Sequence, residues 1–275
     1  TEKERENIEQ CMKVLSDPVG ARNWNPDVAV IEKIKKLNRT ERLIKLRERL
    51  LDSKQQLYIK ERGKLVTESY KATVGEDANI RQAKALAHIL ENYPVYIRED
   101  ELIVGAVTPT PRGCLWFPEV CDWLINEIDT ISTREYNPTL VSEEDKEFYK
   151  KEIHPYWKDR CSYARIQKQL PDEVREKQKY GLWSCGISME QPIGHILSLD
   201  KNRLEHGLKW YKEEAQKLIE TSDQTDPKYI DKIQFWKAII IICDAVHTFA
   251  LRYANEAEKM AATCKDEKRK AELEK

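Results

Sequence analysis

The chain has 275 residues, enough for one large domain or two small ones with a substantial buried core. Charged residues make up 35% of the sequence, yet the formal net charge is only −1. This balance excludes a global basic field that would attract nucleic acid or an anionic membrane surface, and the charges are typical of solvated helix faces.

The composition indicates a reduced, mainly α-helical protein. Only 9 glycines occur, so we expect helices with a few short strands. The 7 cysteines are irregularly spaced without a C-x-x-C pair, which favours a cytoplasmic location over a disulfide framework. The longest apolar run, 238–246, is interrupted by Asp244, and the N-terminus has no apolar signal region. We therefore expect neither a membrane span nor a signal peptide.

Helix signals dominate the first third of the chain. Residues 1–39 mix charged and loop-forming residues and are interpreted as a variable extension. Thr40 is a predicted helix cap, with apolar residues at helical spacing after it. Further helices are predicted over 57–70 and 78–92, the latter ended by Pro94 because proline disfavours helix at the residue before it.

The pattern changes after Pro94 and becomes helical again towards the end. Two short β-type runs, 95–97 and 102–104, flank a charged turn. Helices are predicted over about 119–129, from the capping-box-like Ser142 to about 153, over 203–221 and over 228–264. The last residues, 265–275, are charged and prone to form helix.

No self-sufficient catalytic or cofactor motif is present. The sequence has no G-x-G-x-x-G, P-loop, H-E-x-x-H or G-x-S-x-G pattern. The acidic run 143–145 is interpreted as helix-start stabilisation, and Cys185 as a buried thiol rather than a nucleophile. His88 and His247 are interpreted as packing residues with a satisfied ring nitrogen. The histidines are scattered, with no metal-ligand spacing, at positions His88, His154, His195, His206 and His247.

His195 is the candidate site residue. It lies in the loop Pro192-Ile-Gly-His195, beside small residues that would let a ligand approach the backbone. An imidazole there can hydrogen-bond a substrate hydroxyl or carboxylate, or move a proton. The alternative is a histidine that caps the following turn.

Three groups of segments, in order, carry a family resemblance. The first comprises 61–71, 81–92 and Glu101-Leu-Ile-Val-Gly105; the second, Phe117-Pro-Glu, 127–130, 141–146 and 155–158; the third, Gly194-His195, 230–233 and 252–257. Over residues 40–275 the chain resembles the N-terminal part of the glycyl radical enzymes related to pyruvate formate-lyase. The subgroup contains glycerol, propanediol and hydroxyproline dehydratases, choline trimethylamine-lyase and arylacetate decarboxylases.

The resemblance implies a fold, a mechanism and partners. The fold is a ten-stranded α/β barrel surrounded by helices, of which this chain would form the helical N-terminal part. A glycyl radical, installed by a separate radical-SAM activating enzyme, abstracts hydrogen from a cysteine whose thiyl radical attacks a small substrate. No tightly bound cofactor is implied, and a homodimer is usual. In the dehydratase branch a matching histidine lines the substrate pocket, which here would be His195.

The reactive loops of that family are missing from this chain. The family places its cysteine and acid in a G-C-x-E loop and its radical glycine in a C-terminal R-V-x-G-Y loop, and neither occurs here. Gly113-Cys114 is followed by Leu-Trp-Phe instead. We therefore expect a truncated enzyme part, inactive alone, whose catalytic residues lie in the remaining C-terminal portion. The alternatives are an arylacetate decarboxylase of the same family and a non-catalytic helical scaffold or interaction protein.

Overall fold

The computed structural model describes residues 40–181 and 201–275. The chain forms two compact units, residues 1–47 and 48–275. Of the first unit the structure describes only residues 40–47, which begin helix α3 (Glu41–Asp52). The backbone N–H of Leu43 donates to Oγ1 of Thr40 over 3.3 Å, so the predicted cap is confirmed.

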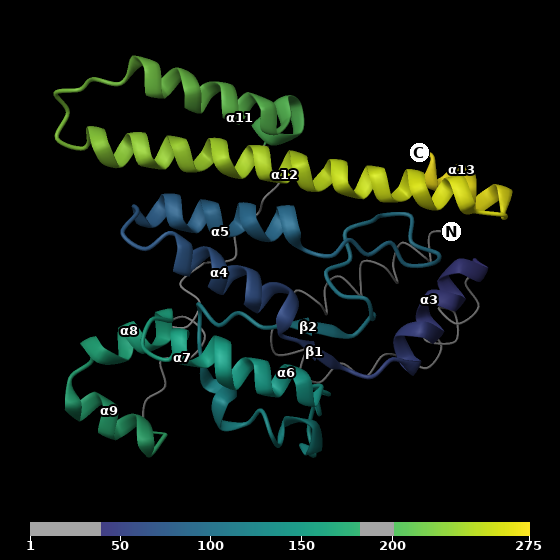
Figure 1. Cartoon of the computed structure of the whole chain (residues 1–275), viewed down its shortest axis with the longest axis horizontal. Coiled ribbons are helices and arrows are strands. Elements are labelled where there is room, and N and C mark those ends of the chain that lie inside the picture. Colours follow the sequence, from purple (N-terminus) through teal and green to yellow (C-terminus); the bar gives the residue numbers. More distant parts are fainter. Residues whose placement is uncertain (1–39, 182–200) are drawn as a thin grey trace, which may run out of the picture. The chain divides into compact units, whose positions relative to one another are not determined.

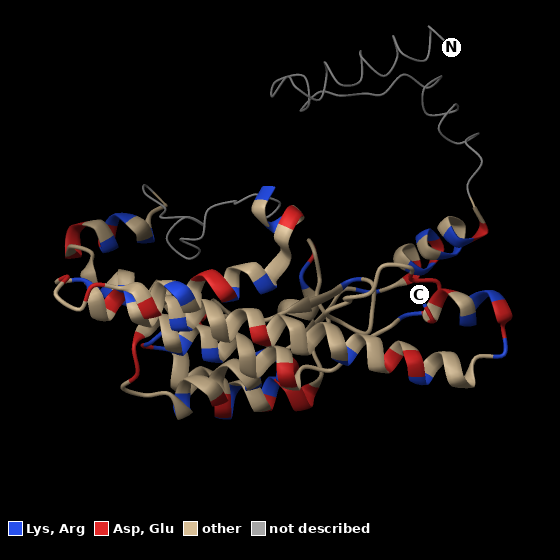
Figure 2. Ribbon diagram, turned by 90° about the horizontal axis from the view of Figure 1, so that it is seen from above, with Lys and Arg blue, Asp and Glu red and all other residues tan. Residues whose placement is uncertain are grey.

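The second unit is mainly helical, as the composition predicted (Figure 1). In chain order its described helices and helical turns are η2 (Lys60–Lys64), α4 (Leu65–Ala72), α5 (Ala78–Asn92), η3 (Trp123–Asn126), η4 (Ile131–Thr133), α6 (Glu143–Phe148), η5 (Tyr149–Ile153), α7 (His154–Trp157), α8 (Ser162–Gln169), α9 (Asp172–Lys179), α11 (Lys201–Thr221), α12 (Tyr229–Thr263) and α13 (Glu267–Leu273). Basic and acidic positions are interspersed along these helices (Figure 2), which fits a net charge close to zero.

A two-stranded parallel sheet lies where the sequence indicated none. Strand β1 (Gln56–Tyr58) pairs with β2 (Gly113–Leu115), with Leu57 opposite Cys114. The helix predicted over 57–70 therefore begins later, at η2. Leu57 is buried, and its backbone N–H donates a hydrogen bond to the carbonyl of Leu140 instead of taking part in a helix. The predicted strands at 95–97 and 102–104 are wrong: this region makes only an isolated bridge between Tyr96 and Ala106.

The main core is built from residues that are far apart in sequence. Its largest fully buried side chains include Tyr149, Ile59 and Leu124. The indole N–H of Trp157 donates to Oγ1 of Thr67 over 2.8 Å, which joins α7 to α4 inside this core. The helix predicted over 119–129 is replaced by the tight turn η3, and η4 follows it; these turns bring Leu124 and Ile131 inward.

Helix α12 packs lengthwise against α5 on one side and α11 on the other (Figure 1). Ile80 and Ala83 of α5 are buried against Ala238 of α12, and small side chains at the contact allow the two backbones to approach closely. Helix α11 is broken at Gly207, whose φ of 69° departs from helix.

An 18-residue window of α12 has a mean hydropathy of 1.4, which is enough by length and composition alone for a membrane span. The expectation of no membrane span rested on the shorter run 238–246, which Asp244 interrupts, and it stays a prediction. Only 22% of the window is buried within the structure. A single helix of this kind is weak evidence, because core helices of other proteins pass the same test.

A substitution at Gly113 tests how closely strand β2 approaches Thr108. A Cβ at this position would overlap Cβ and Oγ1 of Thr108, a buried residue. We expect Gly113→Ala to lower the free energy of unfolding by about 1–3 kcal/mol, because overpacked sites force the backbone to move. Urea denaturation measures the change.

Gly63→Ala is the matched control for this substitution. Its added Cβ would lie 3.8 Å from Cγ2 of Ile59, an ordinary contact, and alanine favours helix. The two variants should therefore shift the urea midpoint by clearly different amounts, and equal losses would contradict the proposed overlap.

Candidate functional site

His195, the predicted site residue, lies outside the described residues, as do Cys185 and the Pro192–His195 loop. The structure does place other histidines. His88 is a surface residue whose Nε2 lies 3.2 Å from a carboxylate oxygen of Glu68, and His247 is exposed on α12. His88 is half-buried and its ring nitrogens lie within hydrogen-bond distance of Glu68 and Asn92, which agrees with the prediction of a satisfied ring nitrogen. His247 is exposed, so the interpretation of that histidine as a packing residue is wrong.

The segment that follows α5, residues 93–107, is held in place by α12. The guanidinium of Arg252 donates to the carbonyls of Leu90 and Tyr93, each over 2.6 Å. The hydroxyl of Tyr253 donates to the carbonyl of Ala106 over 3.0 Å, and that of Tyr93 donates to Val107 over 2.5 Å. Carbonyls at the end of α5 and in the irregular segment after it thus receive side-chain donors, which fixes the path of the segment.

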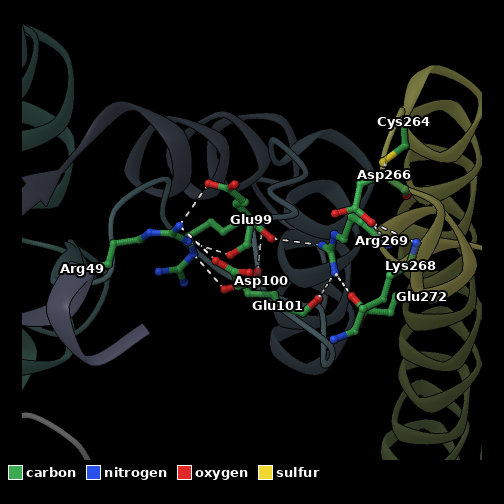
Figure 3. A network of polar contacts seen from close by, with 10 residues as sticks. Arg49, Glu99, Asp100, Glu101, Cys264, Asp266, Lys268, Arg269 and Glu272 are labelled. Carbon is green, nitrogen blue, oxygen red and sulfur yellow. Dashed lines mark hydrogen bonds and ion pairs between the residues drawn. The ribbon is translucent and has the colours of Figure 1, made fainter. Parts of the chain in front are cut away.

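Two further arginines hold the charged turn within this segment (Figure 3). Arg49 donates to the carbonyl of Glu99 over 2.6 Å and pairs with the carboxylate of Asp100 over 3.3 Å. Arg269 of α13 donates to the carbonyls of Glu101, over 2.7 Å, and Arg98, over 3.2 Å. Asp100 adopts a φ of 66°, a left-handed turn conformation that these contacts stabilise.

The same segment presents an apolar tip to solvent. Leu102 is 63% exposed and Ile103 is 92% exposed. Beside them a pocket of about 760 Å³ is lined by the tip, by Phe249 and Tyr253 of α12 and by Leu273 of α13. The region is a fixed apolar surface, and its chemistry is that of packing rather than proton transfer.

Removal of Arg252 tests this arrangement. Arg252→Ala leaves two partly buried carbonyls without their donors, so the free energy of unfolding should fall by about 2–4 kcal/mol. Lys237→Ala, at an exposed position of the same helix, should change it by less than about 0.5 kcal/mol. Thermal or urea unfolding distinguishes the two; an equally small loss in both variants would show that the segment is held by other contacts.

A buried polar cluster lies at the other end of the core. The carboxylate of Asp122 accepts a hydrogen bond from the hydroxyl of Tyr149, and one of its oxygens lies 2.5 Å from Nδ1 of His154. The side chain of Asp122 is 6% exposed and that of His154 is 24% exposed. Because the carboxylate is an acceptor, Nδ1 of His154 carries a proton, and in the neutral imidazole Nε2 is then an acceptor.

Burial is the largest influence on the pKa values of Asp122 and Tyr149. It raises the pKa of Asp122, an effect that the hydrogen bonds from Tyr149 and His154 partly oppose. Burial, followed by the bond to Asp122, raises the pKa of Tyr149 far above its usual range, so the phenol remains a donor. Burial also raises the pKa of the Cys161 thiol beside the cluster, which makes it an inert thiol.

Sequence reasoning missed this cluster. Asp122, Tyr149 and His154 come from separate elements, and no local spacing links residues that are 32 positions apart. Among the described residues no three side chains that could ligate a metal come together.

The raised pKa of Asp122 gives a prediction with a definite sign. Between its unfolded pKa and its higher folded pKa, the folded protein binds more protons, so this group's contribution to stability falls as pH rises. Asp122→Asn removes that dependence. The free energy of unfolding of the wild type, minus that of Asp122→Asn, should therefore decrease across this window above pH 3.8, as measured by urea titration at several pH values. A difference that is flat or increases with pH would contradict the raised pKa.

The fold and the two sites define a helical scaffold that presents a fixed apolar segment, and comparison with known proteins identifies its family. Residues 31–275 match the family described as pyruvate formate lyase-like. The chain therefore belongs to this family, as the sequence resemblance predicted.

Known relatives and solved structures agree with this assignment. The chain is 35% identical over 224 residues to isethionate sulfite-lyase from Oleidesulfovibrio alaskensis. That alignment covers 78% of this chain and 27% of the sulfite-lyase. It is 30% identical over 234 residues to trans-4-hydroxy-L-proline dehydratase from Clostridioides difficile. That alignment covers 85% of this chain and 29% of the dehydratase. The glycerol-bound B12-independent glycerol dehydratase from Clostridium butyricum superposes with a TM-score of 0.81 at 36% sequence identity. The superposition covers 86% of this chain and 30% of the dehydratase chain. The chain thus spans less than a third of the length of these relatives.

Proposed function

We propose that this chain is the N-terminal portion of a glycyl radical lyase or dehydratase that cleaves a C–O, C–N or C–C bond of a small substrate. The family match over residues 31–275 carries the proposal. Its support is the sequence identity to enzymes named as lyases and dehydratases. The chain covers 27% and 29% of these two relatives, which supports a part of a longer protein rather than the whole.

In this proposal the residues described here build and hold the scaffold, and the reaction takes place elsewhere. A glycyl radical supplies the hydrogen abstraction that starts the chemistry, through a cysteine thiyl radical. The one Gly-Cys pair in the sequence does not fit that cysteine: Gly113 and Cys114 form β2, are paired with β1, and are followed by Leu-Trp-Phe. His195 is proposed to bind substrate through one ring nitrogen.

The proposal extends to partners and location. A radical-SAM activating enzyme would install the radical, and the remaining C-terminal part of the protein would supply the reactive loops. The protein would be a cytoplasmic homodimer. These proposals follow from membership of the family, together with the irregular spacing of the cysteines in the sequence.

Two alternatives remain distinguishable. Arylacetate decarboxylation by an enzyme of the same family is the first. The second is a non-catalytic helical scaffold or interaction protein. The apolar tip, where Ile103 is 92% exposed, fits a surface that packs either against another part of the protein or against a partner, so it does not separate this alternative from the enzyme part. A reading frame that continues past Lys275 into G-C-x-E and R-V-x-G-Y loops would support the enzyme part, and a stop codon there would favour the scaffold.

Turnover by the activase-treated full-length protein tests the proposal. The panel comprises glycerol, 1,2-propanediol, trans-4-hydroxy-L-proline, isethionate, choline and an arylacetate, assayed without oxygen. Substrate-dependent product from one of these compounds supports a radical lyase and names its reaction. No turnover of any compound, in a protein shown by electron paramagnetic resonance to hold the radical, would count against these substrate classes. Failure to form a radical would favour the scaffold.

His195→Ala tests the one site residue that the sequence offers. Loss of a substrate hydrogen bond should lower kcat/KM by about 1–3 kcal/mol in equivalent free energy. His88→Ala, at a surface histidine on α5, serves as the matched control and should leave kcat/KM unchanged. If the kinetics of His195→Ala equal those of wild type, His195 does not bind substrate.

A further inference from the structure

The buried cluster around Asp122 opens onto a pocket that the proposed radical chemistry does not use. The pocket has a volume of about 620 Å³, within the range of small-molecule sites. Its walls include Asp122, Trp123, Ile125, His154 and Lys158. It therefore combines an apolar wall and a buried carboxylate with four basic side chains, His154, Lys158, Lys168 and Arg175.

His154 and Lys158 lie one helical turn apart and line the same pocket. The backbone N–H of Lys158 donates to the carbonyl of His154 over 2.9 Å, the bond of an α-helical turn. Side chains four residues apart on such a turn occupy the same face. The two basic groups are thus placed to contact one small molecule together.

The other basic groups of the pocket already have partners. Lys168 pairs with Asp159 over 3.0 Å. The guanidinium of Arg175 pairs with Asp172 and donates to the carbonyls of Gln167 and Leu170. Within the described part of the chain, by contrast, neither the ammonium of Lys158 nor Nε2 of His154 has a hydrogen-bond partner. These two groups are the ones left to meet a ligand.

Nε2 of His154 and the ammonium of Lys158 require different groups on a ligand. Since Nδ1 of His154 donates to the buried carboxylate of Asp122, Nε2 of the neutral imidazole presents a lone pair and requires a donor. Lys158 presents a cation with donors only and requires an anion. A metal ion is not favoured, because no cluster of three ligating side chains exists among the described residues.

We propose that this pocket binds a small molecule with a hydroxyl group beside an oxyanion, the hydroxyl donating to Nε2 of His154 and the oxyanion pairing with Nζ of Lys158. Asp122 acts as a positioning residue that fixes the ring and its tautomer. Hydroxy acids and polyol phosphates share this chemistry. The inference rests on these contacts and does not depend on the radical reaction.

Isothermal titration calorimetry of the full-length protein provides the test. Glycolate and glycerol 3-phosphate are the two probes, which distinguish a hydroxy acid from a polyol phosphate. Acetate, which lacks the hydroxyl group, and glycerol, which lacks the anionic group, are the controls. We expect at least one probe to bind about tenfold more tightly than both of these controls, the size of one hydrogen bond to a charged group.

Variants locate the binding. His154→Asn keeps an N–H that can reach Asp122 but removes Nε2, and Lys158→Met removes the charge but keeps the stem. Each should raise the dissociation constant about tenfold. Lys151→Met is the control, because Lys151 is 72% exposed, pairs with Glu147 and does not line the pocket; it should leave binding unchanged.

Three results would overturn the proposal. These are no binding of either probe at millimolar concentration, binding that neither His154→Asn nor Lys158→Met weakens, and equal weakening by Lys151→Met. Circular dichroism establishes that each variant is folded. If His154→Asn is not folded, Lys158→Met alone decides the outcome, because its side chain is exposed and makes no ion pair among the described residues.

Discussion

The packing of α12 along α5 is the contact on which the rest of this structure depends. Small side chains let the two helices approach, and Arg252 then reaches the carbonyls at the end of α5. Because those carbonyls have no helical partners of their own, the guanidinium satisfies groups that would otherwise be costly to bury. Residues 93–107 acquire their path from this junction, through Tyr253 and Arg269.

Part of the fold could be predicted from the sequence. The helix predicted over 78–92 coincides with α5, because Asp77 caps its start and Pro94 ends it. The last long helix differs from its prediction by one residue at each end. Local signals of this kind suffice where an element's own residues determine its limits.

The errors arise where partners distant in sequence decide the outcome. Leu57 continues an apolar helical pattern, yet it forms a strand because Gly113–Leu115 and Leu140 offer backbone partners. Residues 119–129 read as helix, but core packing of Leu124 and Ile128 favours tighter turns. Asp122 and His154 have no local signature at all, since only the fold brings them together. The candidate His195 lies beyond the described residues, so its role remains a prediction.

The separation of α5 and α12 along the chain has a consequence for biosynthesis. Arg252 and Leu90 are 162 residues apart, so α5 leaves the ribosome long before its partner exists. During that interval Ile80 and Ala83 have no surface to bury against, and such exposed apolar stripes promote aggregation. Closing so long a loop is also slow. The nascent chain is therefore expected to need protection by a chaperone until α12 has been translated.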